Sequence, residues 1–399
     1  MALTALPTAS PSATATVPRR PVASPAWRHI DVLLVCAAAA TTAIGVLMVY
    51  STTRVPLAAA GLNPRAEMTK QATYAFVAFA AFLATIFFDY KRYLSWAPVL
   101  YIGSILLLLA TLAIGRTTLG ATSWIQVGSI EVEPAELVKI TFIISLAALL
   151  ASRKGNITGR VLVLVLGLSV VPFLLIYKQD ALGSAMVLAV VIVGMLLMAG
   201  TKGRHMVVLA LLAVLAIGGI SETGVLKQYQ RDRLITFLTA PSGVATTNNA
   251  GNPYAASIEY NLDQSKAAIA DGGIAGKGLF KGPQTNLSYV PNQDTDFIFT
   301  AMAEQFGFVG SALLLALFGI VVWRSWRAAI VSRDLAGTLI CVGVLAMLMF
   351  QVFENIGMTM GIMPVAGITL PFMSYGGSSM VVDWVAIGLV VNVGMRRFS

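Results

Sequence analysis

The chain has 399 residues, of which 57% are hydrophobic and only 11% are charged, and its mean hydropathy is +0.80. About a quarter of the residues are charged in soluble domains, so the composition excludes an ordinary soluble protein and favours one that crosses a membrane several times. The net charge of +9 carries no pattern typical of nucleic-acid binding, because the Lys and Arg residues are spread between apolar segments.

The first 28 residues are rich in Pro, Ala, Ser and Thr and contain no apolar run, which is typical of a disordered tail. Several later segments reach the roughly 20 apolar residues that span a bilayer. We expect ten membrane spans, at about 30–50, 71–89, 97–114, 134–152, 161–177, 182–200, 205–220, 300–323, 335–356 and 377–394. The span at 205–220 is the shortest, so a re-entrant segment stays open there. The predicted fold is an all-α polytopic membrane protein, with residues 29–397 as one transmembrane domain.

Lys and Arg residues are distributed unevenly between the two sides of this predicted bundle. With the N-terminus inside, the inside segments hold fifteen of them and the short outside segments hold five. Cytoplasmic loops carry the excess of positive charge, so both termini are predicted to face the cytoplasm. Cys36 and Cys341 fall in separate spans, while His29 and His205 lie at inside helix ends. Neither a disulfide framework nor a metal cluster is indicated.

The next informative element is the segment at 123–139, which leads into the fourth span. Pro134 suits the first turn of a helix. Glu136 and Lys139 are three residues apart, so they share a helix face and can pair. The pair could hold the helix in place or belong to a site, because ionisable residues inside a membrane bundle suggest function. Both interpretations stay open.

The longest polar segment, at about 221–295, is predicted to lie outside between the seventh and eighth spans, and loops of this length are usually functional. It contains a glycine-rich run at 272–282 with Lys277 and Lys281, followed by Gln284. The run is no Walker loop, because Gly278 stands where Ser or Thr should bind magnesium. Glycine amides beside lysines suit phosphate, but a flexible hairpin with solvated lysines explains the same pattern.

Two carboxylates, Asp294 and Asp296, stand where this polar segment enters the eighth span, and no cation lies among them. A carboxylate at the mouth of a membrane helix is unfavourable unless it is hydrated, paired or used in chemistry. Glu304 follows inside the predicted span. We therefore expect a functional carboxylate at this boundary.

The last polar feature is the Gly- and Pro-rich segment at 355–379, which ends in Gly376-Gly377-Ser378-Ser379. Irregular backbone at membrane depth is tolerated only where it is buried in protein or lines a wet cavity. The start of the last span would present free amides that attract anions. The polar features thus converge on the outer face. With both histidines inside and no nucleotide motif, we expect extracytoplasmic chemistry on a lipid-borne substrate, without ATP.

Four motifs carry a family resemblance: the 124–139 segment, Gln264-Ser265-Lys266 with the loop to Gly278, Thr295-Asp296-Phe297-Ile298-Phe299, and the segment at 371–379. On these residues the chain resembles the SEDS family (shape, elongation, division and sporulation proteins) over about 29–397. It is most similar to the RodA branch, because Lys266 follows Gln264-Ser265 and Gly282-Pro283-Gln284 precedes Tyr289-Val290-Pro291.

The resemblance implies a peptidoglycan glycosyltransferase that polymerises lipid II at the outer face of the bacterial cytoplasmic (inner) membrane, for cell elongation and shape. It implies a class B penicillin-binding protein, a transpeptidase, as the partner. The family's essential acid corresponds to Asp296, and its buried pair to Glu136 and Lys139. Further substrate-binding candidates are Lys277, Gln284, Ser374, Tyr375 and Ser378.

In this interpretation Asp296 is the general base of an inverting transfer, a role that contributes about 10²–10⁴-fold. A divalent cation (Mg or Mn) could neutralise the departing pyrophosphate, and no nucleotide is needed. The sequence departs from the family pattern at Asp294, at Asp180 with Ala181 in the usual acid position, and at Asp383, whose role it does not explain. A division-type FtsW homologue, a lipid II flippase or transporter, and a non-catalytic scaffold stay open as alternatives.

Overall fold

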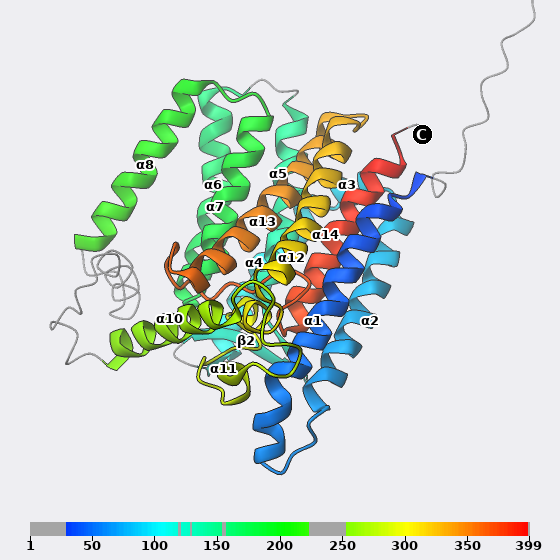
Figure 1. The fold of residues 1–399 in the computed structure, drawn as a ribbon. Coiled ribbons are helices and arrows are strands. Elements are labelled where there is room, and N and C mark those ends of the chain that lie inside the picture. Colours follow the sequence, from blue (N-terminus) through cyan, green and yellow to red (C-terminus); the bar gives the residue numbers. More distant parts are fainter. Residues whose placement is uncertain (1–28, 119–120, 128–129, 154–156, 223–252, 398–399) are drawn as a thin grey trace, which may run out of the picture.

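The computed structural model describes residues 29–118, 121–127, 130–153, 157–222 and 253–397 (Figure 1). Its helices are α1 Val32–Ala59, α2 Ala66–Phe87, α3 Tyr90–Ser95, α4 Ala97–Ile114, α5 Pro134–Ser152, α6 Gly159–Lys178, α7 Leu182–Met198, α8 Gly203–Glu222, α10 Pro253–Gly272, α11 Pro283–Asn286, α12 Ile298–Ile330, α13 Leu335–Met360 and α14 Gly377–Met395. The predicted tail at 1–28 and part of the predicted outer loop, 223–252, lie outside the described residues.

Each of the ten predicted spans coincides with a helix, which confirms the all-α polytopic fold. Among the described helices, eight are long and apolar enough to cross a membrane, and α7 is shorter at 17 residues. The segment left open at 205–220 lies within α8, one helix of 20 residues at the margin of the bundle (Figure 1). Helices α5, α13 and α14 are buried along most of their length, whereas α2 and α4 are largely exposed.

Helix α1 is longer than its apolar run predicts, because contacts beyond the membrane span hold its last turns. Arg54 donates to the carbonyl of Phe280 at 2.7 Å and to the Asn286 side chain at 3.2 Å, and the Arg54 guanidinium lies over the Phe280 ring. Tyr50 packs edge-on against the same ring. The α11 segment therefore rests on the projecting end of α1 (Figure 1).

A small antiparallel sheet, which the sequence did not predict, connects α4 to α5. Its order is β1 Arg116–Thr118, β2 Ala121–Val127 and β3 Ile130–Val132. Trp124 pairs with Arg116, and Ile125 pairs with Val132. The sheet lies at the same end of the bundle as α10 and α11, while α1 begins and α14 ends at the other end (Figure 1). Its last strand, β3, leads into Pro134 at the start of α5.

Helix α12 is broken at Gly307, whose φ of 63° and ψ of −161° are not helical. The glycine strap, defined here as residues 272–278, lies against this break and exchanges main-chain hydrogen bonds with it. Those bonds run from Lys277 N to Glu304 O (3.0 Å), Gly278 N to Gln305 O (2.9 Å), Phe308 N to Gly273 O (2.9 Å) and Val309 N to Ile274 O (3.1 Å). In an unbroken helix the amides of Phe308 and Val309 would instead bind the carbonyls of Glu304 and Gln305. The strap therefore satisfies groups that a membrane helix cannot leave unpaired.

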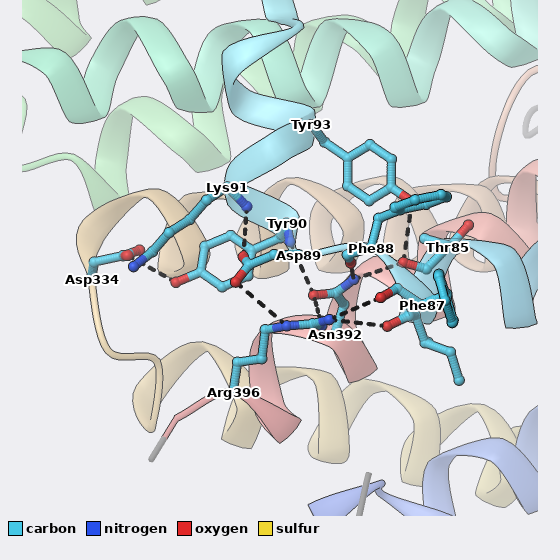
Figure 2. A network of polar contacts seen from close by, with 11 residues as sticks. Thr85, Phe87, Phe88, Asp89, Tyr90, Lys91, Tyr93, Asp334, Asn392 and Arg396 are labelled. Carbon is cyan, nitrogen blue, oxygen red and sulfur yellow. Dashed lines mark hydrogen bonds and ion pairs between the residues drawn. The ribbon is translucent and has the colours of Figure 1, made fainter. Parts of the chain in front are cut away.

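The end of the bundle away from the sheet is tied together around Asn392 of α14 (Figure 2). The Asn392 amide nitrogen donates to the carbonyls of Thr85 at 2.7 Å and Phe88 at 2.5 Å, where α2 ends. Its oxygen accepts from the Tyr90 amide at 3.1 Å, and the Tyr90 hydroxyl donates to Asp334 at 2.8 Å. Helices α2, α3, α13 and α14 are thereby joined at one point.

Candidate active site

Asp296 lies in the turn immediately before α12, and its position is fixed through its main chain. The Asn355 side-chain amide of α13 donates to the Asp296 carbonyl at 2.8 Å and to the Ile368 carbonyl at 2.7 Å. Gly367, with a φ of +68°, brings the 361–376 segment beside the acid, so that a Cβ on Gly367 would lie 3.5 Å from Asp296 Oδ2. The Asp296 side chain stays partly exposed.

The residues just before Asp296 are held by the segment that leads into α14. Ser374 Oγ donates to the Thr295 carbonyl at 2.7 Å and accepts from Leu370 N at 2.8 Å. Tyr375 N donates to the Asp294 carbonyl at 2.9 Å. Ser374, a predicted substrate ligand, thus braces the backbone in this structure.

The Asp294 side chain lies in a more enclosed environment than its loop position suggests. Burial raises the pKa of Asp294 above its ordinary value, and the negative charge of Glu67 adds to the shift. The Tyr375 hydroxyl hydrogen-bonds Glu67, which also pairs with Lys70 at 2.9 Å. Tyr375 therefore connects α2 to the turn that carries Asp294.

The predicted pairing of Glu136 and Lys139 is confirmed, with Lys139 Nζ 2.6 Å from Glu136 Oε1 and both side chains buried. Asp383 of α14 lies within electrostatic reach of both charges. Its Oδ2 also accepts from Phe372 N at 3.0 Å. Asp383, unexplained by the sequence, therefore fixes the loop before α14 next to the ion pair.

Glu133, at the start of α5, connects this ion pair to Asp296 and was not among the predicted site residues. Its main-chain amide donates to Ser378 Oγ at 2.9 Å, which joins α5 to the first turn of α14. Burial raises the pKa of Glu133 to about 8. The negative charges of Glu136 and Asp296 also raise this pKa, whereas the positive charge of Lys139 lowers it. Carboxylates that perturb one another at a helix mouth are typical of functional sites.

A cavity of about 510 Å³ opens beside Ser378, between α2, α14 and the start of α5. Its walls are largely apolar, and its lining residues are Thr69, Lys70, Thr73, Tyr74, Val77, Val132, Leu137, Gly377, Ser378 and Val381. One lysine and one buried serine are therefore combined with apolar walls. Such a combination suits an amphiphile with a polar head and a hydrocarbon tail.

The predicted residues in the loop after α10 have mainly structural partners. Lys277 pairs with Asp271 at 2.7 Å on the surface, and the amides of the glycine strap bind main-chain carbonyls. Gln284 N donates to Glu304 Oε1 at 2.7 Å, and Thr285 N donates to Glu304 Oε2 at 2.9 Å. Buried Glu304 thus organises the α11 turn, and a role for Lys277 or Gln284 in substrate binding stays a prediction.

Within the part of the chain that the structure describes, no three His, Cys, Asp or Glu residues are grouped as a metal site. Magnesium is commonly held by one or two carboxylates together with substrate phosphates. Asp296 and its neighbours fit that limited role. The arrangement as a whole combines a fixed acid, a buried ion pair and an amphiphile-sized cavity at one end of the bundle.

Comparison with known proteins places this arrangement among cell-envelope proteins. Residues 31–398 match the FtsW/RodA/SpoVE family, described as "Cell cycle protein". The chain is 32% identical to stage V sporulation protein E of Bacillus subtilis over 92% of this chain and 97% of that protein. It is 34% identical to peptidoglycan glycosyltransferase MrdB of Escherichia coli K12 over 77% of this chain and 80% of MrdB.

Two solved structures are similar along nearly their whole length. One comes from work on the structural coordination of polymerization and crosslinking by a peptidoglycan synthase complex, with a TM-score of 0.77 and 30% identity over 93% of this chain and 99% of that one. The other is the rod shape determining protein RodA of Thermus thermophilus, with a TM-score of 0.67 and 27% identity. The match covers 94% of this chain and 100% of the RodA chain.

Proposed function

This chain belongs to the FtsW/RodA/SpoVE family, and from that membership we propose that it is a peptidoglycan glycosyltransferase acting on lipid II. The main observation that supports the proposal is the local environment of Asp296. Its backbone is anchored by Asn355, its carboxylate is partly exposed, and its charge acts on Glu133. The relative MrdB bears the name of this activity.

In the proposed reaction the acceptor sugar hydroxyl attacks the anomeric carbon of a polyprenyl-diphosphate-linked donor. Asp296 takes the hydroxyl proton as the new glycosidic bond forms, and the electron pair of the breaking bond leaves with the diphosphate. A positioned general base contributes about 10²–10⁴-fold to such a step. Because a donor with an α linkage yields a β linkage, a single displacement with inversion is expected.

The anionic leaving group needs positive charge or hydrogen-bond donors nearby. Lys139 is buried against Glu136, so its charge is largely offset within the protein. Lys70, whose side chain is more exposed and pairs with Glu67 at 2.9 Å, lines the same 510 Å³ cavity as Ser378. A divalent cation held by the substrate's phosphate oxygens would supply further charge when bound and would leave Asp296 to act as the base. The cavity then accommodates part of the polyprenyl chain.

The proposal extends to location and partner. The bias of Lys and Arg toward the end where α1 begins and α14 ends supports a cytoplasmic position for both termini and an extracytoplasmic site. The similarity to a chain of a synthase complex that coordinates polymerization with crosslinking supports a class B penicillin-binding protein as the partner. An elongation role of the RodA type rests on Lys266 and the 282–284 segment.

The decisive experiment is polymerisation of lipid II by purified protein, with and without the partner. Asp296→Asn should insert into the membrane normally and have the same thermal unfolding temperature as the wild type. Its polymerisation rate should fall at least 100-fold, because the base is gone. Exposed Asp263 of α10 provides the matched control, since Asp263→Asn removes a carboxylate from the same end of the bundle. Equal product from wild type and Asp296→Asn would remove Asp296 as the base.

A further inference from the structure

Gln71 places a buried polar group on the inward-facing stripe of α2. The buried residues of this helix are Gln71, Ala78, Phe82 and Thr85, which recur at helical spacing on one face. Gln71 is 0% exposed. A carboxamide buried in this way is unfavourable unless both of its ends are hydrogen-bonded, so its partners show what the residue holds.

Both partners of Gln71 lie in the segment that leads into α14. Gln71 Nε2 donates to the Ser374 carbonyl at 2.9 Å, and Gln71 Oε1 accepts from Gly376 N at 3.3 Å. Ser374 Oγ in turn donates at 2.7 Å to the carbonyl of Thr295, the residue directly before Asp296. Through Ser374, hydrogen bonds in series therefore join α2 to the turn that carries the acid.

Helix α2 also forms one wall of the 510 Å³ cavity. The residues that line this wall are Thr69, Lys70, Thr73, Tyr74 and Val77, and those that α14 contributes are Gly377, Ser378 and Val381. A Cβ on Gly377 would lie 3.2 Å from the Tyr74 ring, so the two walls approach closely. Gln71 follows Lys70 of one wall and binds Gly376, which precedes Gly377 of the other. It therefore connects the two walls.

The position of α2 depends on few neighbouring elements. The helix lies at the edge of the bundle, where it packs on α1 and α14, and most of its residues face outward (Figure 1). An occupant of the cavity contacts α2 and the first turns of α14 at once, so it fixes the spacing between them.

We propose that Gln71 is a positioning residue through which the hydrocarbon chain of the lipid substrate fixes the place of Asp296. This inference rests on the proposed function. A polyprenyl chain in the cavity sets the spacing of the two walls, and the hydrogen bonds of Gln71 and Ser374 extend from these walls to the turn before α12. Binding energy from a remote part of the substrate is then used to position the base, which raises kcat.

The test compares kcat of the full-length protein on lipid II that carries a long (undecaprenyl) or a short (farnesyl) chain. In the wild type the short chain should lower kcat about tenfold, in addition to any rise in KM. Gln71→Leu keeps the bulk of the side chain but removes both hydrogen bonds. Its kcat on the long-chain substrate should fall about tenfold, and the ratio of its two kcat values should approach unity.

That ratio separates positioning from stability, because it does not depend on the fraction of protein that is folded. Gln179 provides the matched control, since it is also 0% exposed and donates to the Leu108 carbonyl at 2.9 Å. It joins the end of α6 to α4, and neither helix lines the cavity. Gln179→Leu should lower the thermal unfolding temperature and keep the wild-type ratio.

Ser374→Ala breaks the next hydrogen bond of the series and leaves the Ser374 carbonyl available to Gln71. It should reproduce the loss seen in Gln71→Leu. The double variant should lose no more than either single variant, because both changes interrupt the same connection. Should Gln71→Leu fail to fold, Ser374→Ala decides the question by the same ratio.

A wild-type ratio retained in Gln71→Leu would overturn the proposal. Equal kcat of the wild type on both chains, with the difference confined to KM, would overturn it as well. Failure of the proposed function has a different signature. The wild type and Asp296→Asn would then give equal product on both substrates, and the positioning role would fall with the base.

Discussion

The side-chain amide of Asn355 holds Asp296 in place from 59 residues away in the sequence, by donating to its carbonyl at 2.8 Å. The same nitrogen donates to Ile368 O at 2.7 Å. One α13 residue therefore positions both the turn with the proposed base and the segment that passes over it.

Replacing Asn355 by Leu should distinguish the role of Asn355 in positioning Asp296 from its role in stabilising the fold. Both hydrogen bonds are lost, and the buried Ile368 carbonyl loses its donor from Asn355, at about 1–3 kcal/mol of stability. We expect the folded protein to lose more than tenfold in kcat, because the base is no longer held at the reacting hydroxyl.

Asn392 provides a matched control for that variant. It also donates to two main-chain carbonyls, those of Thr85 and Phe88, but at the other end of the bundle (Figure 2). Asn392→Leu should lower the thermal unfolding temperature while leaving kcat of the folded fraction near wild type. Comparable loss of kcat in both variants would show that Asn355 acts only on stability.

The Glu136 and Lys139 pair can be tested by reversal. Either single neutral substitution leaves one buried charge unpaired and should destabilise the protein by about 3–5 kcal/mol. The reversed double variant, Glu136→Lys with Lys139→Glu, should recover much of the thermal stability.

Polymerisation should nevertheless stay low in the reversed protein. The Lys139 charge acts on both Glu133 and Asp383 from its present position, and reversal moves that charge by most of a helical turn. Full recovery of lipid II polymerisation would instead assign the pair a purely structural role.

Glu133 should make stability depend on pH. Burial raises its pKa from 4.5 to about 8, so near neutral pH the folded protein holds a proton that the unfolded chain releases. The resulting stabilisation is full below pH 4.5 and is lost as pH rises through about 8. Glu133→Gln should flatten this decline in thermal unfolding measured from pH 5 to 9.

Glu131, which is exposed on β3, gives the control for that measurement. Glu131→Gln should leave the decline of stability between pH 5 and 9 as it is in the wild type. An unchanged decline in Glu133→Gln would mean that another group is responsible.

The glycine strap should tolerate a methyl group at one left-handed glycine but not at another. A Cβ on Gly276 would lie 2.2 Å from Gln305 O, whereas a Cβ on Gly273 would meet no atom within 4 Å. Both residues have positive φ, at +80° and +53°, so both alanine variants lose about 1–2 kcal/mol to backbone strain.

Gly276→Ala should additionally push the strap from α12 and expose the break at Gly307 to limited proteolysis. Gly273→Ala should remain as resistant as the wild type. Equal protease sensitivity of the two variants would show that close approach of the strap to α12 does not hold the joint.

The spans and the position of Asp296 could be predicted from the sequence because both depend on local hydropathy. An acid at the end of a polar segment, directly before an apolar helix, is visible without any structure. The pairing of Glu136 with Lys139 was equally local, since three residues separate them on one helix.

What could not be predicted depends on contacts between distant segments. The sequence shows Asn355 as an amide at the end of an apolar span, beside a Gly- and Pro-rich segment, which was a usable signal for a polar contact. Nothing local shows that Asn355 or Glu133 acts on Asp296. From the sequence, the amides of the glycine run were suited to binding phosphate. In the structure, amides of this run instead donate to main-chain carbonyls of α12 next to its break. The sheet escaped prediction because its strands are at most seven residues long.

The break at Gly307 divides α12, the longest of the described helices, into a short first part at 298–306 and a longer second part. The strap binds the carbonyls of Glu304 and Gln305 before the break and the amides of Phe308 and Val309 after it, so it splints the two parts across the joint. The bend of α12, and with it the position of the turn that carries Asp296 relative to the rest of the helix, is therefore set by the strap.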